Sequence, residues 1–390
     1  MVDTIVIALA SFFLNPVVYI GLLVLFFIAH QRVKLERESF HTRVYARRAD
    51  FLFSIIPSFV AGVLISIATV AVGALLPIDV VIAIGVATLL LLVTGQMQLV
   101  TPTYLFLLVG LYLVLVPQVI AVPNIDDSMR ASFIFPTILF IMTVCLLAQA
   151  VLIRKNGSKL VSPQLEQGKR GRYVGIHKIN RLWIIPVVFF IPEGIVSLPW
   201  SWPLFTVGNL ALQPVLFPIF LGFKLQTRNQ MHRRTDQHTR TYLLLAIIAA
   251  VSTIIVTFYP NAWLFASILG LMGLLHLTLQ LSIWQKAKKD PAFFTEEEES
   301  CRVVGVLPHS PAGKMNILIG EELTKVNGMI VFDETTLYQA LQKNAVYCKI
   351  EVKDKDGEKR FVQGPLYNGE HYQLGVLLVR KQEKLSNSII

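Results

Sequence analysis

The chain has 390 residues, of which 54% are hydrophobic and only 15% are charged, and its formal net charge is +10. A soluble domain keeps about a quarter of its residues charged, so this composition excludes an ordinary soluble protein and favours a membrane protein. The charge is unevenly spread, because residues 1–290 hold 23 Lys and Arg against 11 Asp and Glu, whereas residues 291–390 hold 12 against 14. A basic apolar body therefore precedes a near-neutral polar tail, and the positive charge requires no nucleic-acid partner.

The apolar body divides into nine stretches, each close to the ~20 residues that a membrane-spanning helix needs. They are residues 12–30, 51–73, 78–94, 101–122, 131–153, 182–200, 202–223, 241–258 and 262–284. Residues 4–10 are too short to cross alone and precede the Asn15-Pro16 break, so they lie at the interface or extend the first helix. The N-terminus has no basic n-region or small-residue cleavage site, and we expect the first stretch to be retained.

The sixth and seventh stretches contain an unusual number of prolines. These are Pro186, Pro192, Pro199, Pro203, Pro214 and Pro218. Proline removes a helical hydrogen bond, and in a membrane the freed carbonyl must be satisfied by neighbouring helices. We therefore expect two kinked helices packed inside the bundle.

The loops between these stretches carry a strong charge bias. The loops of one set, together with the segment after the ninth stretch, hold 22 Lys and Arg; the loops of the opposite set hold one, Arg130. Since basic loops stay in the cytoplasm, the C-terminus and the loops Gln31–Asp50, Arg154–Arg181 and Lys224–Arg240 are predicted to be cytoplasmic. The same loops can also hold anionic membrane lipids.

Residues that could support catalysis or metal binding are sparse. None of the eight histidines is followed by Glu, so the zinc-protease pattern His-Glu-x-x-His is missing, and the three cysteines fit no metal spacing. No Gly-x-Ser-x-Gly, Walker or Rossmann pattern occurs either. We therefore expect no enzyme activity, no cofactor and no metal, and reduced structural thiols at Cys145, Cys301 and Cys348.

Glu193 is the single carboxylate deep within a predicted span. Such a group costs a few kcal/mol unless it is paired or protonated, which makes it a functional candidate. Three interpretations of Glu193 are open: a structural hydrogen bond to backbone freed by Pro192, a re-entrant turn around Pro192–Gly194, or coupling to a proton or solute.

The polar tail has the pattern of a small α+β domain. Cys301–Leu307 and Tyr347–Lys353 alternate like strands, and Asp333 is a plausible N-cap for a helix over Glu334–Gln342. Val303–Gly328 resembles the bacterial PDZ pattern through three turn motifs. These are Ser310-Pro311-Ala312, Gly320 with Glu321, and Val326-Asn327-Gly328.

The resemblance implies a groove that binds an extended C-terminus by strand addition, with backbone N–H groups holding the terminal carboxylate. No carboxylate loop precedes Cys301, whereas Gln373-Leu374-Gly375-Val376 near the end suits a permuted bacterial PDZ domain. The groove would then lie between Leu374–Leu378 and the helix Thr335–Gln342, with Gln373, Leu374, Gly375, Val376, Leu378, Thr335 and Gln339 as its binding residues.

An ordinary closing strand that binds no peptide is the alternative. We expect Leu337, Leu341 and Val326 in the core, and expect Gly375→Glu to block the groove while leaving that core undisturbed.

The expected architecture is thus a polytopic α-helical membrane bundle of about nine spans, followed by a PDZ-like domain. The domains are 1–285 for the membrane body, 286–300 for a charged linker, 301–380 for the PDZ-like domain and 381–390 for a tail.

This layout, with Phe40–Tyr45 (FHTRVY) and Ser310–Met315 (SPAGKM), resembles the MinJ family of cell-division topology determinants of Gram-positive rod-shaped bacteria. The resemblance implies a non-enzymatic adaptor of the cell membrane that recruits division-site-selection proteins to septa and poles through its cytoplasmic loops and its PDZ domain. It implies bridging of the scaffold DivIVA to the ATPase MinD, with FtsA and other divisome members as further partners. A membrane transporter or lipid-handling protein with a regulatory PDZ domain is the alternative, and a membrane protease accessory factor is a third.

Overall fold

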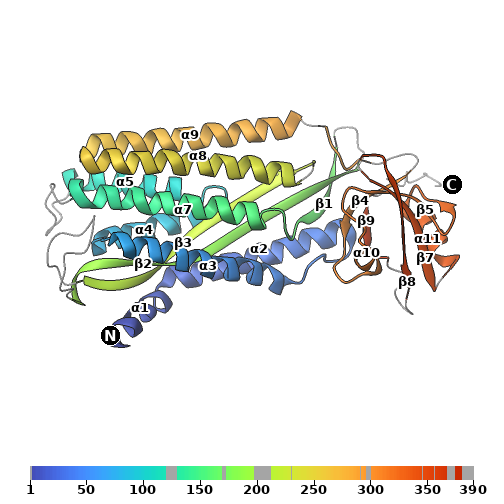
Figure 1. Ribbon diagram of the computed structural model, residues 1–390, viewed down its shortest axis with the longest axis horizontal. Coiled ribbons are helices and arrows are strands. Elements are labelled where there is room, and N and C mark those ends of the chain that lie inside the picture. Colours follow the sequence, from blue (N-terminus) through green and yellow to red (C-terminus); the bar gives the residue numbers. More distant parts are fainter. Residues whose placement is uncertain are drawn as a thin grey trace, which may run out of the picture.

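The computed structural model describes residues 2–119, 130–168, 173–196, 212–229, 231–289, 291–295, 300–344, 346–354, 356–366 and 374–379. A long helical body, which contains the N-terminus at one end, carries a small β-rich domain at its other end (Figure 1). The predicted combination of an apolar helical body with a C-terminal sheet domain is therefore present, although not with nine helical spans.

The described helices of the body follow the apolar stretches of the sequence. They are α1 (Val2–Phe13), α2 (Pro16–Phe40), α3 (Arg47–Val72), α4 (Ile78–Val93), α5 (Pro102–Val119), the π-turn η1 (Arg130–Ile134), α7 (Phe135–Asn156), α8 (Met231–Phe258) and α9 (Ala262–Lys289). Within the described ranges, five of them, α2, α3, α7, α8 and α9, are long and apolar enough to cross a membrane. The helices α4 and α5 are apolar but shorter.

The sixth and seventh predicted helices are wrong, because their described parts are β-strands. Strands β1 (Ser162–Gln167), β2 (Tyr173–Val196) and β3 (Leu212–Thr227) form an antiparallel sheet in the order β1-β2-β3. The β2–β3 pair runs along the length of the helical body (Figure 1). Most residues between Leu182 and Phe190 are β-branched or aromatic, which favours a strand, and a strand buried on both faces shows the same continuous apolar run as a helix.

The prolines explain why these segments can be strands inside the body. Neighbouring residues of a strand point their backbone groups to opposite edges, with a period of two. The N–H of Val188 faces outward to Ser66 Oγ at 3.0 Å, and the N–H of Leu216 faces outward to Ser11 Oγ at 3.1 Å. Like Val188 and Leu216, the four prolines of the paired segments have even residue numbers, so their backbone nitrogens face an outer edge of the ribbon. The missing N–H of each proline therefore costs no hydrogen bond to the partner strand. These prolines are Pro186, Pro192, Pro214 and Pro218.

The outer edges of the β2–β3 ribbon are satisfied by helix side chains and loops. Thr69 of α3 donates to the carbonyl of Val188, and Gln149 of α7 donates to the carbonyl of Gly222 at 2.8 Å. Phe190 exchanges backbone hydrogen bonds with the turn after α3, through Ala74 and Leu76. In an apolar layer each unsatisfied backbone group costs several kcal/mol, so these contacts allow an open ribbon to lie within a membrane body.

The C-terminal domain is a six-stranded antiparallel sheet with two helices. Its elements are β4 (Cys301–Val306), α10 (Pro311–Lys314), β5 (Glu322–Val326), β6 (Met329–Ile330), α11 (Glu334–Gln342), β7 (Tyr347–Lys353), β8 (Lys359–Pro365) and β9 (Val376–Leu378). The strand order is β8-β7-β5-β4-β9, with β6 paired to β5. The predicted core positions Leu337, Leu341 and Val326 are all buried in it.

The domain is packed against the polar end of the ribbon. Gly175 of β2 donates its N–H to the carbonyl of Phe294 at 2.8 Å, and His177 Nε2 lies 2.8 Å from the carbonyl of Val304. Phe294 and Val304 form one apolar cluster with residues of the α2–α3 segment and of β9. The other buried members are Phe40, Val44 and Leu377. A small apolar cluster, separate from the core of the body and from the core of the C-terminal domain, therefore joins the two.

The described basic segments lie at this same end of the body. The C-terminal ends of α2, α7 and α9, the strand β1 and the N-terminal end of α8 lie toward the C-terminal domain (Figure 1). The two ribbon strands replace two predicted helices as one pair of passes, so the alternation of ends is unchanged. The charge bias of the sequence therefore corresponds to one physical end of the molecule.

Candidate peptide-binding groove

The helix α11 forms one wall of the groove between α11 and β9. It begins at a capping box, in which the Asp333 carboxylate accepts the N–H of Thr336 at 2.7 Å and the Thr336 hydroxyl accepts the N–H of Asp333 at 3.1 Å. Leu337 and Leu341, one turn apart, then point to the same side. Asp333 thus acts as the predicted N-cap, and the cap fixes the helix start.

The opposite wall is β9, preceded by the loop Leu374–Gly375. Among the described strands, β9 pairs with β4 alone, so it is an edge of the sheet. Side chains alternate along β9: Val376 and Leu378 pack with the domain core, whereas Leu377 packs with the cluster that joins the domain to the body. Both walls of the groove are therefore fixed by buried side chains.

The loop before β9 directs two backbone N–H groups away from the sheet. The carbonyl of Leu374 accepts from the N–H of Ala312 at 2.9 Å, and the carbonyl of Gly375 accepts from the N–H of Leu307 at 2.8 Å. In a trans peptide the N–H points opposite to the carbonyl. The N–H groups of Gly375 and Val376 therefore point away from the Leu307–Ala312 turn.

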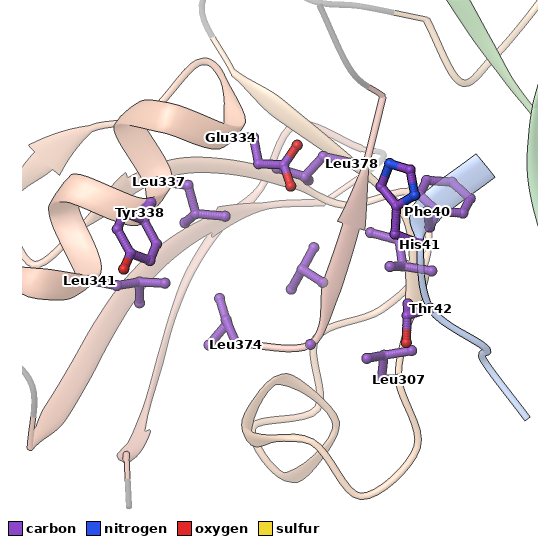
Figure 2. A pocket seen from close by; sticks show the side chains of 13 residues that line it. Phe40, His41, Thr42, Leu307, Glu334, Leu337, Tyr338, Leu341, Leu374 and Leu378 are labelled. Carbon is purple, nitrogen blue, oxygen red and sulfur yellow. The ribbon is translucent and has the colours of Figure 1, made fainter. Parts of the chain in front are cut away.

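A pocket of about 250 Å³ lies between these walls. Figure 2 shows leucines from both walls around it, with Leu337 and Leu341 on the α11 side and Leu374 and Leu378 on the β9 side. The half-exposed Tyr338 lies at the α11 side as well. This arrangement suits one apolar side chain of an extended peptide.

The end of α2 also lines this pocket, which the sequence did not indicate. Phe40, the last residue of α2, lies beside β9 with His41 and Thr42, which follow the helix (Figure 2). His41 ends the helix in the left-handed conformation with a φ of 56°, and its N–H is bonded to the carbonyl of Arg37. The FHTRVY segment, singled out by resemblance alone, thus contributes to the groove.

The other predicted binding residues fall in two groups. Thr335 and Gln339 lie on α11 and are exposed, but they do not line the pocket, where Glu334 and Tyr338 take those places. Gln373 lies outside the described residues.

The predicted turn motifs have structural roles. Ser310 caps α10, whose first residues Pro311 and Ala312 are buried, and Gly320 and Gly328 have φ values of 96° and 82°. Asn327 donates from Nδ2 to the carbonyl of Ala340 at 2.9 Å and accepts from the N–H of Lys349 at 3.0 Å. This side chain ties α11 to β7 and so fixes the position of α11 on the sheet.

The acidic position Glu321 is buried and bonded. Its carboxylate accepts from Arg360 at 2.8 Å and from the N–H of Leu318 at 2.8 Å. Glu321 therefore serves the fold, as a buried charged acceptor that joins β8 to the turn before β5.

Glu193 lies in β2 instead of a helix, between Pro192 and Val196, where the pairing with β3 shifts register. Its side chain is outside the described residues, so its three readings stay predictions.

The described side chains offer no metal centre. Within the described ranges, no group of three or more His, Cys, Asp or Glu could hold a metal ion. All three cysteines are free and buried, and burial raises the pKa of the Cys348 thiol to about 12. That thiol is therefore protonated and unreactive at neutral pH.

The chain is similar to proteins of one kind. The cell division topological determinant MinJ of Bacillus subtilis (strain 168) is 27% identical over 378 residues, which cover 95% of this chain and 93% of that protein. A probable cell division topological determinant MinJ of Lacticaseibacillus paracasei is 24% identical over 238 residues, 60% of this chain and 62% of that protein. No family model and no solved structure matches the chain. The chain is a homologue of MinJ, which confirms the resemblance derived from its layout.

Proposed function

We propose that this MinJ homologue is a membrane-anchored, non-catalytic adaptor of cell division that captures the extended C-terminus of a division protein. The proposal is supported by the match over 95% of the chain to a protein described as a cell division topological determinant. It is also supported by a body whose described part holds five helices able to cross a membrane.

The observation that carries the capture mechanism is the pocket between β9 and α11. The peptide would add as an antiparallel strand to the outer edge of β9, and its last side chain would enter the pocket. Its terminal carboxylate would receive the N–H groups of Gly375 and Val376, whose direction is fixed by the carbonyls bonded on the other side. Main-chain bonds would supply affinity, and the leucine-lined pocket would select an apolar terminal residue.

The segment Phe40–Thr42 gives this groove a direct link to the membrane body. A peptide beside β9 would contact the end of α2 as well as the PDZ-like domain. Recruitment would therefore depend on the domain being docked on the body.

The proposed partners are DivIVA and MinD, bridged at septa and poles, with FtsA and other divisome proteins as further candidates. The basic end and the C-terminal domain would face the cytoplasm, where these partners act.

The capture mechanism is tested by a photo-crosslinking amino acid placed at Tyr338, in the full chain in dividing cells. We expect crosslinks to the last few residues of a division protein, and we expect them to disappear when that protein's C-terminus is extended by a few residues. The matched control carries the same photo-crosslinking amino acid at Gln339, which is exposed but does not line the pocket. Crosslinks from Tyr338 that survive the extension would exclude capture of a C-terminus.

The adaptor role is tested separately by localisation. A fluorescent fusion carrying Tyr338→Asp should reach the membrane but lose at least one division protein from the septum, because the added charge opposes both a carboxylate and an apolar side chain. The Gln339→Asp fusion, with the same charge change one residue away, should recruit normally. Uniform membrane staining by the unmodified fusion in dividing cells would contradict a role at septa and poles.

A further inference from the structure

A second cavity, which we call the ribbon cavity, lies at the basic end of the body. It has a volume of about 350 Å³ and is bounded by α2, the start of α3, the α4–α5 turn, β1 and the two ribbon strands. It is far larger than one water molecule, and its wall is mostly polar or charged.

The ribbon cavity lies at the level where the apolar part of the body ends. Each segment around it changes from apolar to polar where it meets the cavity: α2 after Ala29, α4 after Val93, and β3 after Phe223. In β2 the change runs the other way, from Arg181 to the buried apolar residues that begin at Leu182. Four segments that switch at one level mark the boundary between hydrocarbon and headgroups.

The cavity has more positive charge than its own carboxylates neutralise. Arg32 is fully paired, because its guanidinium binds Asp50 at 2.8 Å and Glu36 at 2.6 Å. Within the part of the chain that the structure describes, no ion pair joins Lys178, Arg181 or Lys224 to a carboxylate. The four lining cations against Asp50 in the lining and Glu36 behind Arg32 leave a net charge of +2 around the cavity. The nearby Glu166 adds nothing to this balance, because it is paired with Arg228.

Two of the three unpaired cations are at least partly withdrawn from water. Arg181 is 4% exposed, and Lys178 is half-buried. Burial lowers the pKa of Lys178; Glu166 opposes this effect, and the like charge of Lys224 adds to it. The Arg181 guanidinium donates to the carbonyl of Lys159 and lies over the Phe53 ring, but neither contact neutralises its charge. A buried cation without an anion is costly, so an anion would complete the site.

Buried polar atoms in the wall also lack partners. Arg181 Nε, Ser162 Oγ and Asn180 Oδ1 have no hydrogen-bond partner among the described residues, and Arg181 and Ser162 are each more than nine-tenths buried. Two of these atoms are donors and one is an acceptor. An occupant with both anionic oxygens and hydroxyl groups would match them.

We propose that the ribbon cavity binds a phosphate group with adjoining hydroxyls, supplied by the headgroup of an anionic phospholipid. The phosphate would lie between Lys178 and Lys224, with Arg181 behind it, and the acyl chains would leave along the apolar face of α2, where Phe26 and Phe27 are exposed. The position at the apolar boundary favours a lipid over a soluble phosphate, which shares the same chemistry.

The proposal is tested on the full chain in nanodiscs of phosphatidylcholine with one-quarter phosphatidylglycerol, by native mass spectrometry. We expect one phosphatidylglycerol to stay bound after release from the disc. The variant Lys178→Gln with Lys224→Gln should bind it about thirtyfold more weakly, since each cation near an anionic lipid contributes about fivefold. Lys34→Gln, which removes one exposed charge from the same end outside the cavity, should bind normally.

The double substitution of these lysines by Arg keeps the charge and should restore binding, which separates loss of charge from loss of fold. The side chain of Lys224 is exposed, so the single variant Lys224→Gln should fold normally. Its affinity for phosphatidylglycerol should fall about fivefold. Charge-dependent binding of inorganic phosphate or glycerol 1-phosphate, with no lipid retained, would support the phosphate site and assign it a soluble ligand. Equal lipid retention by the unmodified chain and the double Gln variant would overturn the proposal.

Discussion

Gly375 is the residue on which the shape of the loop before β9 depends. Its φ is 85°, and a Cβ at this position would overlap the Ser310 side chain. A side chain at Gly375 would therefore strain the backbone and displace Ser310 before it reached the groove, which the sequence did not indicate, and the effect of Gly375→Glu on the core stays a prediction. A sequence shows that a glycine is present but not what lies against it.

We predict that Gly375→Ala lowers the free energy of unfolding of the C-terminal domain by at least about 2 kcal/mol, from backbone strain plus overlap. Gly357→Ala is the control, because Gly357 has the same φ of 85° but open surroundings. It should lose only about 1 kcal/mol. Pulse proteolysis of the purified full chain in urea measures both; equal losses would show that the overlap is unimportant.

His177 makes the docking of the C-terminal domain sensitive to pH. Burial lowers its pKa, and the bond to the Val304 carbonyl opposes this only in part. The undocked state therefore takes up a proton more readily, and docking should weaken as the pH falls below about 6.5, the ordinary value for histidine. Spin labels at Lys34 and Lys359 should report a broader distance distribution at pH 5.5 than at pH 7.5. In a His177→Gln variant the distribution should not change with pH.

At the scale of elements, the hydroxyls of α3 are predicted to stabilise the ribbon. Thr69→Val removes the donor to the Val188 carbonyl without changing shape, and should lower stability by about 1–3 kcal/mol because it leaves a buried backbone group unpaired. Thr88→Val is the matched control, since Thr88 is equally buried and bonds only the carbonyl of Ile84 in its own helix. Thermal unfolding in detergent compares them. Equal shifts for the two variants would mean that the ribbon edge does not need the hydroxyl.

The ribbon also shows where sequence reasoning fails. A continuous apolar run such as Leu182–Phe190 has the same pattern in a membrane helix and in a strand buried on both faces, so its length favoured a helix. The even spacing of Pro186, Pro192, Pro214 and Pro218 was the signal that could have identified strands, because only an edge-facing register tolerates them. The apolar runs of the five long helices predicted membrane-spanning helices, and helices are what the structure has there.

The turns of the C-terminal domain were predictable because they are local. Ser310, Gly320 and Gly328 each meet a backbone demand that their own neighbours create. The contribution of Phe40–Thr42 to the pocket could not be predicted, since it depends on two distant segments meeting across the docked interface. The same is true of the ribbon cavity, whose cations come from α2, β2 and β3.

At the scale of the whole molecule, the collection of basic segments at the end that carries the C-terminal domain predicts a single orientation. Positive segments remain in the cytoplasm, so this end should face inward and the α8–α9 turn outward. The native cysteines are at most 4% exposed and should give no background with a membrane-impermeant thiol reagent. In intact cells Tyr259→Cys, at a side chain 72% exposed in that turn, should be labelled, whereas Lys34→Cys and Lys359→Cys should react only after the membrane is permeabilised. Labelling of the two lysine positions in intact cells would reverse the orientation and remove the groove from the reach of cytoplasmic division proteins.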